Sequence, residues 1–102
     1  MIDREQIAAG WATRGFSCET WVDPPGKRWE EFTHDTDELV LVLEGMMEFE
    51  IEGSTVHPQP GEELLIPAGA LHSARNIGST TARWLFGYCV SVERRKTLDH
   101  SP

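Results

Sequence analysis

The sequence predicts an all-β protein, folded as a barrel or a sandwich of sheets, with one short helix at the N-terminus. Two observations carry this prediction. Short runs of β-type residues recur at regular spacing, and glycine or proline separates most of them, which is typical of antiparallel strands joined by turns. The chain also has 102 residues, which is enough for a single domain.

The helix is predicted over residues 3–13. Asp3 is a suitable N-cap, Gln6 follows three residues later as in a capping box, and Gly15 comes after the segment. We therefore divide the chain into a helical segment packed on the barrel (1–15), the β-barrel itself (16–96) and a flexible C-terminal tail (97–102).

The strands are predicted from alternation and from breakers. Residues 16–22 alternate and end at Asp23-Pro24-Pro25-Gly26, because tandem prolines cannot continue a β-ladder. In residues 47–52, Met47, Phe49 and Ile51 form a dry face, and three glutamates form an acidic face expected to be solvated. The remaining strands are predicted at 29–34, 38–43, 55–57, 63–66, 72–77 and within 81–92.

Charge and composition argue against several classes of partner. The chain has 17 acidic and 9 basic residues, a formal charge of −8, whereas phosphate binding depends on clustered Lys and Arg. No apolar run approaches the length of a membrane span, and the N-terminus lacks an apolar leader. Cys18 and Cys89 form no C-x-x-C motif and are interpreted as reduced, buried thiols. We expect a cytoplasmic protein that binds neither nucleic acid nor membranes.

Two stretches carry a specific motif pair. Residues 26–45 read G-x5-F-x-H-x3-E-x6-G, and residues 61–76 read G-x5-P-x-G-x2-H-x3-N. These stretches resemble the two motifs of the cupin superfamily, specifically the small single-domain cupins, at every spacing. The one departure is Phe32, which stands where the first motif has a histidine. The resemblance implies a cupin jelly-roll barrel.

The resemblance also implies one divalent metal inside the barrel, with Fe, Zn, Ni and Mn all candidates. Position by position, His34, Glu38 and His72 carry over as ligands. Two histidines and one carboxylate can form a facial triad on iron or hold zinc with a bound water. The alternative is a metal-free site, in which a protonated His34 or His72 neutralises Glu38.

Strand periodicity gives an independent argument for the same residues. Phe32, His34 and Glu38 share parity with Val40 and Val42, so all five can face the barrel interior. An unpaired carboxylate there would cost several kcal/mol, and a metal would remove that cost. Asp35 and Asp37 have the opposite parity and are expected to cap or solvate a turn, unless a bulge swings one inward.

Aromatic residues are candidates for a substrate pocket. Phe32, Trp84 and Tyr88 could line it, although core or dimer-interface packing is the competing interpretation for the last two. We expect Arg75 and Arg83 to pair with surface glutamates rather than with a substrate.

The sequence thus indicates a mononuclear metalloenzyme of oxygenase or isomerase type that acts on a small organic molecule. The alternatives are a non-catalytic small-molecule binder with a degenerate or metal-free site, and an accessory dimer with a vestigial one. A homodimer is expected, since a chain of this size has a small core and the family tends to dimerise.

Overall fold

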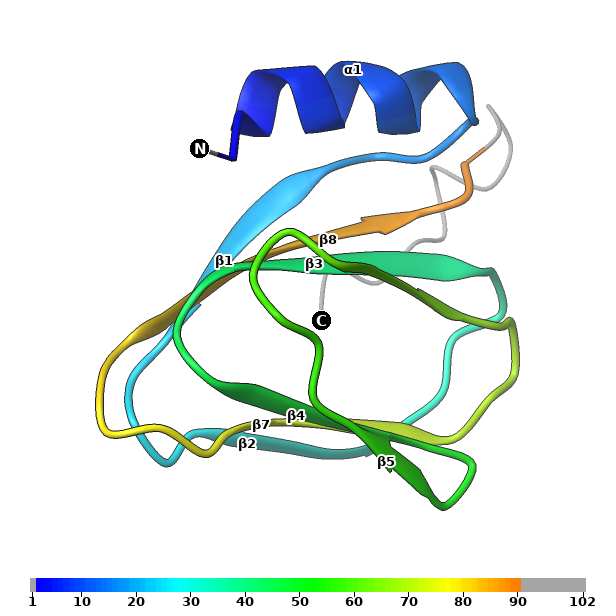
Figure 1. The fold of residues 1–102 in the computed structure, drawn as a ribbon. Helices are drawn as coiled ribbons and strands as arrows, with labels where there is room; N and C mark the ends of the chain where they lie inside the picture. Colours follow the sequence, from blue (N-terminus) through cyan, green and yellow to red (C-terminus); the bar gives the residue numbers. More distant parts are fainter. Residues whose placement is uncertain (1, 91–102) are drawn as a thin grey trace.

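Two four-stranded antiparallel sheets face each other in the computed structural model, which describes residues 2–90 (Figure 1). The first sheet has the order β1-β8-β3-β6 and the second β2-β7-β4-β5. The strands of the first sheet are β1 (Glu19–Asp23), β8 (Ala82–Tyr88), β3 (Glu38–Glu44) and β6 (Glu63–Ile66). Those of the second are β2 (Arg28–Phe32), β7 (His72–Asn76), β4 (Met47–Ile51) and β5 (Ser54–Val56). The predicted all-β jelly-roll with a short N-terminal helix is confirmed; the predicted tail, 97–102, lies outside the described residues.

Helix α1 (Arg4–Thr13) covers the outer face of the first sheet (Figure 1). The Asp3 carboxylate accepts hydrogen bonds from the backbone N–H groups of Glu5 and Gln6, as the N-cap prediction requires. Trp11 is 2% exposed and packs with a cluster that includes Leu39, Leu41 and Leu85. Strand β3 is therefore buried on both faces, because the barrel interior lies on its other side.

Gly87 lets the N-terminal segment approach β8 closely. A Cβ atom at this position would overlap the carbonyl oxygen of Ser17 and lie 3.1 Å from the Trp11 ring. The absence of a side chain at this point of β8 is thus a condition for docking the helix and the segment that follows it.

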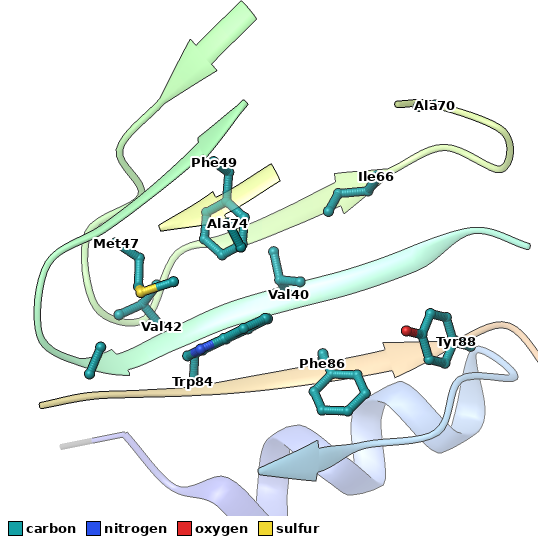
Figure 2. Close-up of a cluster of buried hydrophobic side chains, with 11 residues drawn as sticks. Val40, Val42, Met47, Phe49, Ile66, Ala70, Ala74, Trp84, Phe86 and Tyr88 are labelled. Carbon is teal, nitrogen blue, oxygen red and sulfur yellow. The ribbon is translucent and has the colours of Figure 1, made fainter. Parts of the chain in front are cut away.

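The barrel interior is apolar over most of its length. Val40 and Val42 of β3 meet Met47 and Phe49 of β4, and the Trp84 ring lies edge-on to Phe49 with ring centres 5.5 Å apart. Figure 2 shows Trp84, Phe86 and Tyr88 following one another along β8. Tyr88 therefore lies at the end of the interior away from Trp84.

Asp23 is a buried carboxylate within this interior. It is 2% exposed and accepts hydrogen bonds from three indole N–H groups. Trp21 donates at 3.0 Å, Trp29 at 3.1 and 3.2 Å to the two oxygens, and Trp84 at 3.1 Å. The sequence predicts Asp23 only as the start of a turn and does not reveal that it joins three strands.

Several boundaries differ from the prediction. β1 begins at Glu19 rather than at residue 16, and Phe16 makes only an isolated bridge to Cys89. β2 ends at Phe32 rather than at 34, after a register shift that includes Glu31 at φ +57°. Cys18 and Cys89 are free thiols, but both are half-buried rather than buried. Cys18 lies at the edge of the packing around the helix.

No helix within residues 2–90 is long and apolar enough to span a lipid bilayer.

Candidate metal centre

The candidate site lies at one end of the barrel, where four strands begin or end. Glu38 is the first residue of β3, and His72 is the first residue of β7. Tyr88 ends β8 opposite Glu38, and Phe32 ends β2 opposite His72. His34 lies in the loop from β2 to β3, which connects the two sheets. The antiparallel pairing thus brings residues from distant parts of the chain to one place.

The three predicted ligands lie close together. One potential ligand atom from each of His34, Glu38 and His72 falls within 4.8 Å of the others. Glu38 Oε1 is 3.5 Å from His72 Nε2 and 3.7 Å from His34 Nε2. Two atoms bound to one metal at about 2.0–2.2 Å would be about 3.0–3.5 Å apart. The two distances from Glu38 therefore lie close to those expected around a shared cation.

Two polar atoms of this group are buried without hydrogen bonds. Glu38 is 1% exposed and His72 is 4% exposed. Within residues 2–90, Glu38 Oε1 and His72 Nε2 are buried and have no hydrogen-bond partner. Such atoms are costly unless a ligand satisfies them. A divalent cation would satisfy both, so these residues fit the metal that the sequence implies.

The second nitrogen of His72 fixes the orientation of the ring. His72 Nδ1 lies 3.0 Å from the carbonyl oxygen of Ala70 and donates a hydrogen bond to it. In the neutral ring, Nε2 then carries the lone pair that faces Glu38. Burial alone lowers the pKa of His72, but the nearby Glu38 carboxylate and the Ala70 carbonyl raise the pKa above its ordinary value.

The predicted pocket residues divide into two groups. The Phe32 ring centre is 6.4 Å from those of both His34 and His72. The Tyr88 hydroxyl lies 3.2 Å from His34 Nε2. Trp84, in contrast, packs against Phe49 and Phe86 and donates to Asp23 in the core. That these residues contact a substrate stays a prediction.

The arginines pair with glutamates on the outside, as predicted. Arg75 contacts Glu30 at 2.7 Å, Glu48 at 2.9 Å and Glu50 at 2.8 Å, and Arg83 lies 3.4 Å from Glu44. Hydrogen bonding to Arg75 lowers the pKa of Glu30 to about 2. Two of the glutamates expected to be merely solvated, Glu48 and Glu50, are therefore held in an ion-pair network.

The remaining polar residues near the motifs have local roles. The Asp37 carboxylate accepts a hydrogen bond from the backbone N–H of Ala68, so it joins the loop before β3 to the loop after β6. His57 Nε2 lies 3.0 Å from Glu48 Oε1, on the outside of the barrel. A surface pocket of about 390 Å³, lined in part by Met46, Pro58 and Ile77, shares no residue with the candidate site.

Comparisons with known proteins agree with this architecture. The family model described as "Cupin domain" matches residues 19–88. "Polyketide synthase CurC" of Streptomyces cyaneus is 36% identical over 63 residues, which cover 61% of this chain and 41% of that protein. The chain thus spans about two fifths of the length of this curated relative.

Solved structures show the same fold. A salicylate 1,2-dioxygenase from Pseudaminobacter salicylatoxidans superposes with a TM-score of 0.72 at 19% identity, over 81% of this chain and 24% of that one. An oxalate oxidase solved with the substrate analogue glycolate gives a TM-score of 0.67 at 26% identity, over 76% of this chain and 43% of that one.

Proposed function

The chain belongs to the cupin family, and from that premise we propose that it is a mononuclear metalloenzyme of the oxygenase or isomerase type, acting on a small organic molecule. One observation carries the proposal. Glu38 Oε1 and His72 Nε2 are buried without hydrogen-bond partners within the described residues, and His34 supplies a third potential metal-ligating atom beside them.

His34, Glu38 and His72 would hold the metal through two imidazole nitrogens and one carboxylate. When bound, iron or zinc in such a site supplies dioxygen activation or Lewis-acid polarisation of a carbonyl. The Ala70 carbonyl orients His72 for this task. Phe32 offers only carbon beside the two histidines, so this wall of the site favours an apolar or planar part of the ligand.

For the substrate class, we propose a small carbonyl- or carboxylate-bearing compound, with polyketides as the leading candidates. The name of the curated relative, a polyketide synthase at 36% identity, supports the polyketide class. The oxalate oxidase, at 26% identity, supports oxygen-rich small acids as the second class to screen. The homodimer and the cytoplasmic location expected from the sequence stay predictions.

Metal content tests the proposal. Protein purified without added metal and then offered Fe(II), Zn(II), Ni(II) or Mn(II) should bind close to one equivalent of at least one of them. His34→Ala and His72→Ala should lose it, whereas His57→Ala should retain it, since His57 lies outside the barrel and pairs with Glu48. A folded wild-type protein that binds none of these metals would overturn the proposal. Oxygen uptake or isomerisation in the substrate screen would then identify the reaction.

A non-catalytic binder with a metal-free site is the second candidate. The raised pKa of His72 favours it, because a protonated His72 could neutralise Glu38 at 3.5 Å without a metal. In that case metals would leave the melting temperature unchanged, whereas the polyketide or organic-acid ligand would raise it.

A further inference from the structure

We propose that the phenol oxygen of Tyr88 is a fourth protein ligand of the metal, and that it compensates for the histidine missing at position 32. This inference rests on the proposed metal site and adds a ligand from a different strand. The motif comparison did not suggest it, because Tyr88 lies outside both motif stretches.

The backbone places Tyr88 beside the other ligands. Tyr88 ends β8 directly opposite Glu38 in the β3–β8 register, so the two side chains point to the same face of the first sheet. Tyr88 is 1% exposed, and its ring contacts His34 and Phe86 edge-on, with centres 4.9 and 5.8 Å away. The ring is therefore held by packing, and its oxygen has a defined position.

The distance from Tyr88 fits a shared metal. The Tyr88 oxygen lies 3.2 Å from His34 Nε2, the same nitrogen that lies 3.7 Å from Glu38 Oε1. Donor atoms on one metal are expected about 3.0–3.5 Å apart. The distance from the Tyr88 oxygen to His34 Nε2, like that from Glu38 Oε1, is thus close to the distance expected between two ligands of one metal.

Metal binding by His34 would break its hydrogen bond with Tyr88. With the ring proton on Nδ1, His34 Nε2 has one lone pair, which can accept the phenol hydrogen bond or bind a metal, but cannot do both. When His34 coordinates through Nε2, the Tyr88 hydroxyl loses that acceptor. If the phenol oxygen bound the metal, its proton would pass to solvent and the oxygen would donate an electron pair to the metal. No electron is transferred, so no oxidant is needed.

Iron(III) is the most direct probe, because phenolate bound to iron(III) gives an intense charge-transfer band in visible light that histidine and carboxylate ligands do not. The chain contains one tyrosine, so such a band can arise only from Tyr88. Protein loaded with one equivalent of iron(III) should show the band. Tyr88→Phe should lose it and bind iron about 10–100-fold more weakly, while His57→Ala, which lies outside the barrel beside Glu48, should keep it.

The spectrum and the metal content separate the possible failures. Wild-type protein that binds one iron(III) per chain and shows no visible band would overturn the role of Tyr88 and leave the metal site standing. Failure of the folded wild type to bind any of the metals would overturn both proposals. A weaker affinity of Tyr88→Phe without a wild-type band would mean that Tyr88 only positions His34.

Discussion

At the scale of single residues, the barrel contains two buried carboxylates that differ in their hydrogen bonding. Asp23 is 2% exposed and accepts hydrogen bonds from three indoles, so its oxygens are satisfied by the protein itself. Glu38 is 1% exposed, and its Oε1 has no hydrogen-bond partner within residues 2–90. The first is a structural group, and the second is the group that a ligand would complete.

Asp23→Asn tests the structural role. The amide keeps one acceptor oxygen but turns an NH₂ group toward an indole N–H, so at least one buried donor loses its partner. We expect the free energy of unfolding to fall by about 1–3 kcal/mol, measured by urea denaturation followed by circular dichroism. A loss below about 0.5 kcal/mol, as for an ordinary surface substitution, would contradict this role.

Phe32→His tests the register of the site. The Phe32 ring lies 6.4 Å from both histidine rings, so an imidazole at this position would direct a nitrogen toward the same space. Zinc affinity, measured by competition with a chelator, should rise about tenfold or more. Leu65→His, at a side chain that is 50% exposed, should leave it unchanged. Equal affinities in Phe32→His and the wild type would show that position 32 does not face the metal.

At the scale of elements, β3 connects the helix to the site. Its outer face packs under α1 through Leu39 and Leu41, and its inner face carries Glu38 at the barrel end. The docking of α1 depends in turn on Gly87 of β8, where Ser17 and Trp11 come close.

Gly87→Ala should therefore displace the N-terminal segment. The added methyl group would meet backbone rather than a flexible side chain, so we expect the free energy of unfolding to fall by about 2–3 kcal/mol. Gly10→Ala is the matched control: no atom lies within 4 Å of its added Cβ, and alanine in an exposed helix should stabilise by about 0.5–1 kcal/mol. Thermal unfolding of both variants measures this difference. Equal effects would show that the close approach at Gly87 is unimportant.

The same elements show what local patterns can and cannot predict. Alternation and breakers located most strands, and parity placed Glu38 inward with Val40 correctly because the β3 pairing is regular from Glu38 to Val42. The strand argument does not apply to His34, since β2 ends at Phe32 after its bulge and His34 lies in a loop, yet the side chain faces Glu38 as predicted. The motif spacing nevertheless selected the three residues that the structure brings within 4.8 Å. The Asp23 partners come from β1, β2 and β8, so no local pattern could reveal them.

At the scale of the whole molecule, the net charge of −8 does not mean that the surface glutamates are all unpaired, because several of them form ion pairs with arginine. Arg75 holds Glu30, Glu48 and Glu50 on the outer face of the second sheet, and its own side chain is only 13% exposed. Acidic residues that would repel one another are thereby joined across β2, β7 and β4.

This network predicts a pH-dependent stability. The folded pKa of Glu30, about 2, lies below the ordinary value of 4.5, so its contribution is present above about pH 4.5 and is lost as the pH falls towards 2. Arg75→Gln should lower the urea midpoint at pH 7 by about 0.5 M, and by less than half as much at pH 3. Arg83→Gln, which breaks an exposed pair with Glu44, is the control. A constant difference across this pH range would contradict the role of Arg75.

The ligands of the candidate site come from both sheets: Glu38 and Tyr88 from the first, His72 from the second, and His34 from the loop between them. A metal held by all of them would therefore act as a cross-link, tying the sheets together at the end where side chains with polar groups replace the apolar packing. Metal binding and the closure of that end of the barrel would then be coupled, so that each favours the other. The protein without metal would open at that end first. The width of the entrance that a substrate meets would therefore depend on whether the metal is bound.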